Sequence, residues 1–344
     1  MALVDLPRTN VGIFPTPLQK LHHLSNVLGG PQIFAKREDL TGLAAGGNKA
    51  RHFEFLLAEI KRRGFNAVIS TYGSQSNYLL QLAAAARKLN MEAGFVISEG
   101  QHPEIQGNLL LQKLLNSKVK TLKGSRVSGE YAANVDNEID KMFQEYTQMG
   151  YKPTIVRFGS DPDYDNLSVL GWVDGAEELY HQLQAEKINA QYLVLPVGSC
   201  TTSAGLILGL KFLKSQLRLL GITVSRGKGE VIGRIVEQAT AAANFMGWDV
   251  TVTPEDLTIY DDYIGEKYGV VTEGCLEAIK LVAQSEGFFL DPVYTGKGMA
   301  GLINLIRKGT FTADDKVIFL HTGGFPALFA YDKEIISSCE RENG

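Results

Sequence analysis

Glycine-containing loops carry most of the residues in this chain that could do chemistry. In Ala45-Gly-Gly-Asn-Lys49 a lysine follows two glycines and an asparagine amid apolar neighbours. A lysine is usually a solvated surface charge, but a lysine whose pKa is lowered can form a Schiff base with an aldehyde cofactor. Lys49 is therefore a candidate nucleophile.

Two further loops could hold anions. The loop Val197-Gly-Ser-Cys-Thr-Thr-Ser-Ala-Gly205 offers hydroxyls and the backbone N–H groups of a helix start, which together suit a phosphate. The loop Gly73-Ser-Gln-Ser-Asn77 is similar and could bind a substrate carboxylate. Each loop could instead be an ordinary serine or threonine N-cap. No Walker lysine accompanies the first loop, so a nucleoside triphosphate is not its expected ligand.

A fourth loop, Gly296-Lys-Gly-Met-Ala-Gly301, matches the dinucleotide-binding pattern G-x-G-x-x-G. The next predicted strand ends in His321-Thr322 and not in the acidic residue that binds a ribose hydroxyl, so a tight strand-to-helix turn is favoured. A sheltered lysine, a phosphate-binding loop, an anion-binding loop and the His321-Thr-Gly-Gly324 loop together predict pyridoxal phosphate as the cofactor.

The elements that must position these loops alternate between short β-branched runs and helical stretches. Buried strands are predicted at 67–71, 93–98, 154–158, 192–197, 221–225, 288–291 and 317–321. Helices are predicted at 50–63, 78–89, 203–213, 230–245, 272–285 and 298–307. The alternation predicts an α/β fold with a parallel sheet and helices on both faces, which binds ligands beyond the carboxyl ends of its strands. We expect domain crossings in the turn-rich stretch 160–167 and near Lys49.

Composition excludes several classes of protein. The 344 residues are 44% hydrophobic, and their net charge of -4 is too balanced for a surface that binds nucleic acid or an anionic membrane. No apolar run approaches the length of a membrane span and the start lacks a leader pattern, so we expect a cytoplasmic protein with neither nucleic-acid nor membrane partners. Cys200, Cys275 and Cys339 form no C-x-x-C pair, so neither a disulfide framework nor a metal site is expected.

Six motifs occur in a characteristic order. They are Lys36-Arg-Glu-Asp-Leu, Gly46-Gly-Asn-Lys49, Gln75-Ser-Asn77, Tyr268-Gly, Asp291-Pro-Val-Tyr-Thr-Gly-Lys297 and His321-Thr-Gly-Gly-Phe-Pro-Ala-Leu-Phe-Ala-Tyr331. With them, residues 15–331 resemble the D-cysteine desulfhydrase and 1-aminocyclopropane-1-carboxylate deaminase family of pyridoxal-phosphate enzymes. The resemblance implies a tryptophan-synthase-β-like fold, called fold type II, with two open, mainly parallel twisted sheets. It also implies a homodimer, a larger cofactor-binding domain at 1–50 plus 166–344, and a smaller α/β domain at 51–165.

The resemblance further implies roles for individual residues. Lys49 corresponds to the Schiff-base lysine, while Ser76, Tyr268 and Tyr294 correspond to residues that act on the substrate. Two phenols and a hydroxyl in a cleft can transfer protons without carrying a permanent charge. The remaining expected cofactor-binding residues are Asn48, Asn77, Ser199, Cys200, Thr201, Thr202 and Thr322. The expected substrate-binding residues are Gln75, Ser76, Asn77, Tyr78 and Thr295.

Thr295 and Thr322 distinguish two activities within the family. Deaminases typically carry Glu and Leu in these slots, whereas desulfhydrases carry Thr in both. A hydroxyl that faces the pyridine nitrogen leaves the ring unprotonated, which suffices for removal of an α-proton and loss of a good β leaving group. Opening a cyclopropane should need a stronger electron sink. The resemblance therefore predicts β-elimination from a small β-substituted amino acid, D-cysteine above all, to pyruvate, sulfide and ammonia.

The chain departs from the family at three positions. Tyr78 and Leu80 stand where desulfhydrases usually have His and Arg, and His52 replaces a usual Lys. If Tyr78 and Leu80 face the cleft, the loss of two cations favours small neutral β-substituents over a sulfonate. The alternative is that both side chains pack against the protein, since one side of such a helix is buried.

Three other functions stay open at this stage. The first is deamination of 1-aminocyclopropane-1-carboxylate. The second is elimination from another β-substituted amino acid, such as cysteate, chloroalanine or serine. The third is a pyridoxal-phosphate-binding protein without catalysis, which only the changed Tyr78 and Leu80 suggest.

Overall fold

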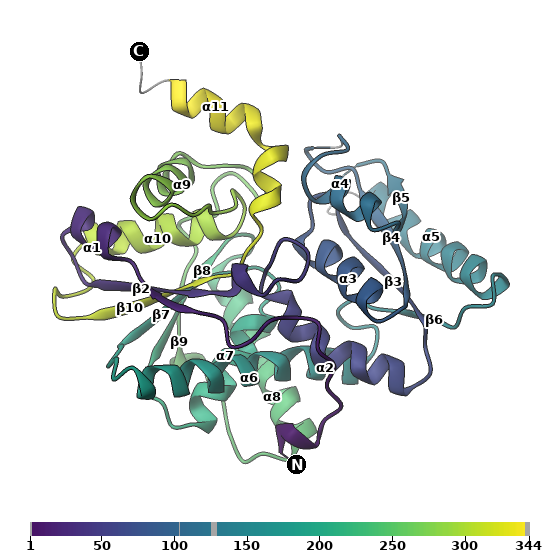
Figure 1. Cartoon of the computed structure of the whole chain (residues 1–344), viewed down its shortest axis with the longest axis horizontal. Coiled ribbons are helices and arrows are strands. Elements are labelled where there is room, and N and C mark those ends of the chain that lie inside the picture. Colours follow the sequence, from purple (N-terminus) through teal and green to yellow (C-terminus); the bar gives the residue numbers. More distant parts are fainter. Residues whose placement is uncertain (1, 103, 125–128, 341–344) are drawn as a thin grey trace.

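Two separate sheets organise the computed structural model, which describes residues 2–102, 104–124 and 129–340. The large sheet has six strands in the order β1-β2-β10-β7-β8-β9, and the small sheet has four in the order β5-β4-β3-β6. Figure 1 shows the large sheet on the left and the small sheet on the right, with α6 below the large sheet and α2 extending from there toward the small sheet. The predicted α/β fold with two mainly parallel sheets is confirmed.

The strands are short, as is usual in open sheets. They are β1 (Leu18–Lys20), β2 (Gln32–Arg37), β3 (Ala67–Gly73), β4 (Glu92–Ser98), β5 (Lys118–Leu122), β6 (Pro153–Ile155), β7 (Tyr192–Val197), β8 (Arg218–Thr223), β9 (Leu257–Tyr260) and β10 (Lys316–His321). Among these pairs only β1 runs antiparallel to its neighbour, β2. The other strands pair in parallel, so their carboxyl ends share one edge of each sheet.

Helices connect and cover these strands. The α-helices are α1 (His22–Leu28), α2 (Lys49–Arg62), α3 (Asn77–Lys88), α4 (Gly107–Leu114), α5 (Gly129–Gln148), α6 (Pro162–Ala185), α7 (Thr201–Phe212), α8 (Lys228–Met246), α9 (Glu273–Glu286), α10 (Thr295–Arg307) and α11 (Asp332–Glu340). Four short 3-10 helices are also present among the described residues: η1 (Leu3–Asp5), η2 (Glu38–Leu40), η3 (Pro254–Asp256) and η4 (Phe325–Ala330).

Both faces of the large sheet are buried under helices. Leu193, Leu195 and Val197 of β7 share one core with α6, α7 and α8, whereas Val194 lies in a second core with α9 and α10. This division follows from the alternation of side chains along a strand. Strands buried on both faces read as continuous apolar runs, and Val317–Leu320 of β10 is such a run with no exposed surface.

Most predicted elements are confirmed, with shifts of a few residues at their ends. The strand predicted at 288–291 is wrong, because these residues form an extended loop with no strand partner in the described chain. The stretch 160–167 is less irregular than predicted, since α6 begins at Pro162 and Asp161 caps it, and its role as a domain crossing stays a prediction. Its proline sits in the first turn, where a missing N–H costs nothing. The domain boundaries at 51 and 166 stay a proposal.

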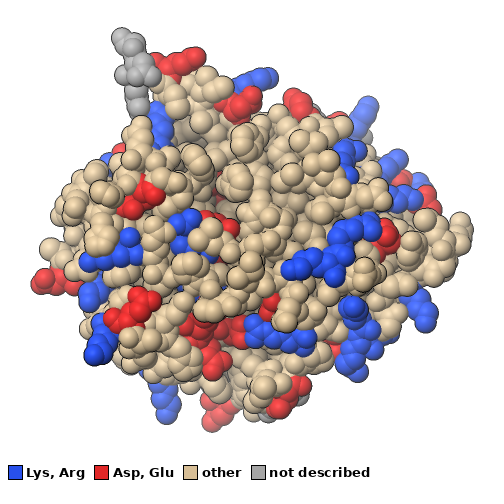
Figure 2. Space-filling view, in the orientation of Figure 1, with Lys and Arg blue, Asp and Glu red and all other residues tan. Residues whose placement is uncertain are grey.

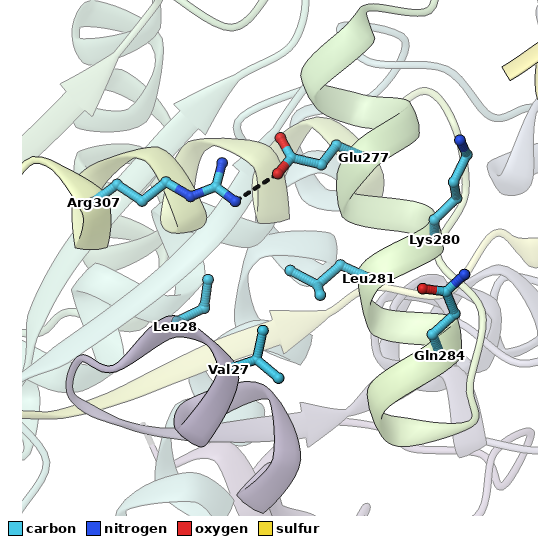
Figure 3. Close-up of a pocket in the computed structure, with 7 residues that line it drawn as sticks. All are labelled: Val27, Leu28, Glu277, Lys280, Leu281, Gln284 and Arg307. Atoms are coloured by element: carbon cyan, nitrogen blue, oxygen red, sulfur yellow. Dashed lines mark hydrogen bonds and ion pairs between the residues drawn. The ribbon is translucent and has the colours of Figure 1, made fainter. Parts of the chain in front are cut away.

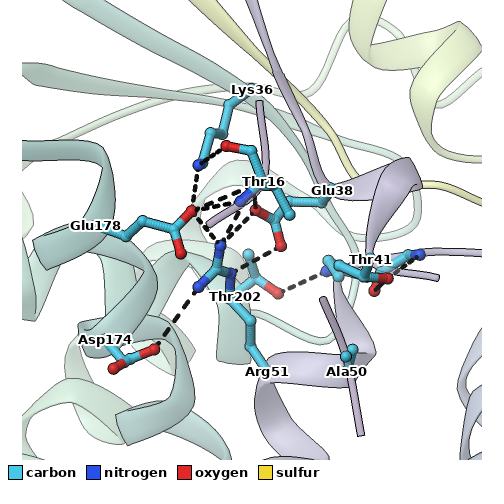
Figure 4. Close-up of polar contacts among 12 residues, drawn as sticks. Thr16, Lys36, Glu38, Thr41, Ala50, Arg51, Asp174, Glu178 and Thr202 are labelled. Atoms are coloured by element: carbon cyan, nitrogen blue, oxygen red, sulfur yellow. Dashed lines mark hydrogen bonds and ion pairs between the residues drawn. The ribbon is translucent and has the colours of Figure 1, made fainter. Parts of the chain in front are cut away.

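A buried ionic network joins the elements around the start of α2 (Figure 4). The Arg51 guanidinium donates from Nε and Nη2 to both carboxylate oxygens of Glu38, each at 2.8 Å, and also to Glu178 at 2.8 Å. Lys36 Nζ donates to Glu178 as well. Burial opposes charge on Arg51, but Glu38 and Glu178 outweigh it and raise the pKa of the guanidinium. The network fixes α2 against β2, η2 and α6.

Replacement of Arg51 should destabilise the protein strongly. In Arg51→Leu, Glu38 would be left buried without its cation, which typically costs about 3–5 kcal/mol. We expect a clear fall in the urea concentration at the unfolding midpoint. Arg307→Leu is the matched control, because the Arg307–Glu277 pair is about half exposed and should contribute at most about 1 kcal/mol. Equal midpoints for the two variants would contradict this account.

Candidate active site

The candidate site begins where the loop before α2 meets the loop after β10. An antiparallel bridge pairs Gly47 with Gly323, and the Asn48 N–H donates to the Thr322 carbonyl at 3.1 Å. Lys49 follows as the first residue of α2. The two backbones therefore fix the start of α2 directly against the end of the central strand β10.

Glycine is required for this approach. Gly46 has φ +76°, and a Cβ there would lie 1.7 Å from the Asp39 carbonyl oxygen. Gly323 has φ +87°, and its Cβ would lie 2.6 Å from Cα of Gly47. Backbone atoms block both positions, so no rotation of a side chain could relieve the clash.

Lys49 has an amine that loses its proton more easily than that of an ordinary lysine. Its side chain is partly accessible, and no hydrogen-bond partner for its amine occurs among the described residues. Burial lowers the pKa of Lys49 to about 8. One turn later His52 donates from Nδ1 to the Ser168 carbonyl at 2.8 Å, and burial keeps the pKa of this imidazole well below its usual value. His52 is thus a neutral neighbour in place of the usual cation.

The predicted phosphate-binding loop lies at the start of α7. Cys200 is the N-cap residue with φ +74°, an uncommon conformation for a residue other than glycine. The first backbone N–H groups of a helix have no intrahelical partner and suit an anion. Thr201 and Thr202 are nearly buried at this turn, and the Thr202 hydroxyl accepts a hydrogen bond from Asn48 Nδ2 at 2.9 Å. Asn48 thereby connects the loop to Lys49.

Two carbonyls of this loop are held from outside by side chains. Arg226 Nη1 donates to the Gly198 carbonyl at 2.9 Å, and Gln238 Nε2 donates to the Ser199 carbonyl at 3.2 Å. In a trans peptide the next N–H points opposite to the carbonyl. The N–H groups of Ser199 and Cys200 therefore point away from Arg226 and Gln238. Burial raises the pKa of Cys200 to about 11, so its thiol stays protonated and the residue can serve through its backbone only.

Thr322 follows β10 between a neutral histidine and the bridging glycine. The Gly323 N–H donates to Nδ1 of His321 at 3.2 Å, so the ring proton is on Nε2, which donates to the Phe289 carbonyl at 3.0 Å. Burial lowers the pKa of His321, which agrees with this neutral tautomer. His321 thus fixes the turn that carries Thr322, and Thr322 itself remains partly accessible.

The predicted carboxylate-binding loop forms the start of α3. Ser76 is its N-cap and accepts a hydrogen bond from the Leu79 N–H at 3.2 Å, which leaves the hydroxyl hydrogen available to a ligand. Asn77 Oδ1 accepts from Asn108 Nδ2 at 2.6 Å, and its Nδ2 would lie 2.5 Å from a Cβ at Gly324. The small-sheet loop and the loop after β10 therefore face each other across the site.

Two of the predicted substrate-binding side chains are engaged inside the protein. Gln75 donates to the Gln106 carbonyl at 3.2 Å and accepts from the Asn108 N–H at 2.9 Å. The fully buried Thr295 hydroxyl donates to Asp291 Oδ1 at 2.7 Å. The geometry gives both residues a structural task, and their substrate-binding roles stay predictions.

Tyr268 and Tyr294 form a pair. Their hydroxyl oxygens lie 2.6 Å apart. A Cβ on Gly198 would lie 2.9 Å from the Tyr294 ring. Tyr294 therefore borders the loop before α7, to which Asn48 is hydrogen-bonded through Thr202. The Asp291 carboxylate accepts the Tyr294 N–H at 2.9 Å and thereby fixes the backbone at this tyrosine.

Tyr78 and Leu80 do not behave alike. The Tyr78 ring packs against Phe53 and Tyr72, with centroids 5.0 and 5.1 Å away, and it remains partly accessible. Burial raises the pKa of Tyr78 well above its usual value, so the phenol is neutral at physiological pH. Leu80 is only 3% exposed, which agrees with the alternative that this side chain packs within the protein.

Other surface features lie away from these loops. A pocket of about 240 Å³ is bordered by α1, α9 and α10, where the Arg307–Glu277 pair lies beside Val27 and Leu281 (Figure 3). On the face in Figure 2, basic and acidic side chains are interspersed. Within the described ranges, no helix has the length and apolar character needed to span a membrane. Those ranges also hold no cluster of three or more side chains suited to a metal ion.

The arrangement fits pyridoxal phosphate. An amine with a pKa of about 8 could attach the aldehyde, and the start of α7 offers N–H groups and hydroxyls to a phosphate. The strand-end hydroxyl of Thr322 and the Asn77 amide supply uncharged polar groups for the ring. Which residue holds which part of the cofactor is our proposal.

Comparison with known proteins also indicates pyridoxal phosphate as the cofactor. The family described as "Pyridoxal-phosphate dependent enzyme" matches residues 9–323. The chain belongs to this family. The enzyme is 37% identical over 334 residues to the D-cysteine desulfhydrase of Klebsiella pneumoniae (strain 342), covering 96% of this chain and 97% of that protein. It is equally 37% identical, over 338 residues, to the D-cysteine desulfhydrase of Yersinia enterocolitica, covering 97% and 98% of the two chains.

Solved structures agree with the fold. A crystal structure of an ACC deaminase homologue is 32% identical, with a TM-score of 0.84, and the match covers 98% of this chain and 97% of that one. Threonine deaminase isoform 2 from Solanum lycopersicum has a TM-score of 0.65 at 17% identity, with 98% and 86% coverage, and supports the fold alone. The expected family, fold type and pyridoxal-phosphate cofactor are confirmed.

Sequence reasoning missed the residues that hold the loops from outside. These are Gln81, Asn108, Arg226, Gln238 and His321. Gln81, for example, accepts the Ala50 N–H at 3.1 Å in the first turn of α2, from a neighbouring helix. Only His321 stood in a motif, and its ring gave no sign of a structural role. The partners of the others come from distant elements and leave no local pattern.

The lowered pKa of Lys49 predicts how cofactor attachment depends on pH. Because the pKa is about 8, the fraction of neutral Lys49 amine increases roughly tenfold for each unit that the pH rises toward 8. The rate at which apoenzyme attaches pyridoxal phosphate should therefore rise up to about pH 8 and then level off. Visible absorbance in stopped-flow mixing follows this rate.

The reference for this experiment is a short peptide with one ordinary lysine, which corrects for titration of the cofactor itself. Its rate should continue to rise toward about pH 10, the usual pKa of lysine. If apoenzyme and peptide show the same pH profile, the Lys49 amine is not depressed and this description of the site is wrong.

Proposed function

We propose that this enzyme is a carbon–sulfur lyase that converts D-cysteine and water into pyruvate, hydrogen sulfide and ammonia. One observation carries the proposal. Asn48, which directly precedes the depressed-pKa Lys49, bonds to Thr202, and Tyr294, whose hydroxyl pairs with that of Tyr268, contacts Gly198 of the same loop. The near full-length similarity to D-cysteine desulfhydrases supports the same reaction.

Lys49 is the proposed base for the Cα proton. Near pH 8 about half of its amines are neutral, because its pKa is about 8. A base is most effective when its pKa lies near the working pH. Pyridoxal phosphate, when bound, supplies the electron sink for this step.

Tyr294 and Tyr268 are the proposed proton donors to the departing sulfur. Their hydroxyls are 2.6 Å apart, so one phenol can replace a proton that the other has given up. The sulfur departs as hydrosulfide, and a proton from a nearby hydroxyl converts it into neutral hydrogen sulfide. Neutral phenols avoid placing a permanent charge beside the substrate.

The start of α3 is the proposed binding site for the substrate carboxylate. The Ser76 hydroxyl keeps its hydrogen for a ligand, and the first N–H groups of α3 carry the positive end of the helix dipole. The negative end of a zwitterionic amino acid suits this position.

Thr322 supports elimination over ring opening. A hydroxyl beside the pyridine nitrogen, next to a neutral His321, supplies no negative charge to keep that nitrogen protonated. A modest electron sink then suffices for loss of sulfide. Tyr78 is a neutral phenol that remains partly accessible, so we infer that small neutral β-substituents are preferred to a sulfonate.

The cellular context is part of the same proposal. We infer a cytoplasmic homodimer from the composition and from the family resemblance. Elution volume with light scattering measures the oligomeric state directly.

The purified holoenzyme should release pyruvate and sulfide in equal amounts from D-cysteine, faster than from L-cysteine. Activity on β-chloro-D-alanine should persist, and activity on D-cysteate should be weaker. A coupled lactate dehydrogenase assay measures pyruvate, and methylene blue formation measures sulfide. Release of 2-oxobutanoate from 1-aminocyclopropane-1-carboxylate at a comparable rate would favour the deaminase alternative.

Variants test the assigned roles. Tyr294→Phe should lower kcat by about 100-fold, the scale of a lost proton donor, while the cofactor absorbance is retained. Tyr192→Phe is the matched control, because Tyr192 stands at the amino end of β7 and packs on Phe311. Full activity of Tyr294→Phe would remove this tyrosine from the mechanism.

A further inference from the structure

Tyr331 contacts the loop that carries Tyr268. It follows η4, is only 4% exposed, and its hydroxyl donates to the Gly269 carbonyl at 3.0 Å. Gly269 is the residue directly after Tyr268. A Cβ on Gly269 would lie 3.7 Å from the Tyr331 hydroxyl, so the hydroxyl lies against this backbone.

The Tyr268 loop needs such support. Residues 261–272 connect β9 to α9 without regular secondary structure, and Tyr268 is 49% exposed. The backbone of an irregular loop lacks the hydrogen-bond ladder of a helix or strand, so contacts from outside the loop help to fix it. Besides Tyr331, the fully buried Lys297 donates from Nζ to the Ile264 carbonyl at 2.6 Å. The loop is thus held on both sides of Tyr268 in sequence.

The ring of Tyr331 contacts the small-sheet side of the molecule. Its centroid lies 4.0 Å from that of His102, in the loop after β4. The His102 carbonyl accepts a hydrogen bond from the Ser74 hydroxyl at 3.0 Å, and Ser74 precedes the Gln75-Ser-Asn77 loop. Figure 1 shows the yellow C-terminal segment approaching α4, where a Cβ on Gly107 would lie 2.9 Å from the Pro326 carbonyl.

We propose that Tyr331 is a positioning residue that sets the Tyr268 phenol against Tyr294 through Gly269, while the tilted contact of its ring with His102 ties this arrangement to the loop that receives the substrate. The inference rests on the proposed function, because it assigns Tyr331 to the proton-donating pair of that reaction. Tyr331 touches neither the substrate nor Lys49 in this account. It acts through the backbone of its neighbour.

Tyr331→Phe is the direct test, since it keeps the ring on His102 and removes only the hydroxyl. With D-cysteine, kcat should fall about five- to tenfold, the effect expected from loss of one hydrogen bond that orients a catalytic group. KM should change less than about twofold, because the start of α3 is untouched. Cofactor absorbance should be unchanged, and Tyr192→Phe should match the wild type in every measurement.

A double-mutant cycle separates positioning from general damage. If Tyr331 acts through Tyr268, adding Tyr331→Phe to Tyr268→Phe should cause almost no further fall in kcat. A purely structural role would instead multiply the two effects. Multiplicative losses, or unchanged kcat in Tyr331→Phe, would overturn the proposal.

Hydrogen exchange supplies a readout that does not depend on substrate. Amide exchange in a peptide covering 261–272 should be faster in Tyr331→Phe than in the wild type or Tyr192→Phe. A wild-type enzyme inactive on D-cysteine would defeat the proposed function, yet faster exchange would still support positioning by Tyr331. Unchanged exchange in Tyr331→Phe would overturn the positioning role whatever the substrate.

Discussion

The contact between Gly47 and Gly323 is the constraint on which the rest of the site depends. These two backbones form a bridge so close that a Cβ on Gly323 would lie 2.6 Å from Cα of Gly47. Through it the start of α2, with Lys49, is fixed to the end of β10, with Thr322. The Arg51–Glu38–Glu178 network holds the same first turn of α2 against η2 and α6. Position and burial of the lysine are thus set by backbone geometry and by charges outside the site.

Several polar groups of the site carry no charge at physiological pH. Burial keeps His52 and His321 neutral. Tyr78 stays a neutral phenol, and Cys200 stays a thiol. In such a site charge is supplied mainly by helix starts and by the ligands themselves, so proton transfer does not compete with strong permanent fields.

Local patterns predicted the elements that follow local rules. Apolar runs gave β3, β4, β7 and β10, and helical periodicity gave α2, α3 and α7 to within a few residues. The run Phe288-Phe-Leu-Asp is apolar although it forms no strand. Phe288 and Leu290 are buried beside His321 and α9, and the Phe289 carbonyl accepts a side-chain hydrogen bond, so no ladder partner is needed. Composition could not distinguish that from a strand.

The loop at 46–49 could be recognised as a candidate site from the sequence. The glycines that allow close backbone approach and the candidate lysine stand together in one short segment. The loop-holding contacts of Arg226, Gln238 and Tyr331 could not be recognised, since their partners are 28, 39 and 62 residues away in sequence, respectively. Their side chains bond to backbone carbonyls, which every residue type possesses. Only the folded arrangement identifies such partners.

The most direct test of the account is to locate the cofactor on the chain. Holoenzyme reduced with borohydride, digested and analysed by mass spectrometry should carry the pyridoxyl group on Lys49, because this amine is depressed in pKa and has no partner among the described side chains. Lys36 and Lys297 are buried lysines whose amines are already hydrogen-bonded, and they should be unmodified. An adduct on either of them, with Lys49 free, would contradict the account.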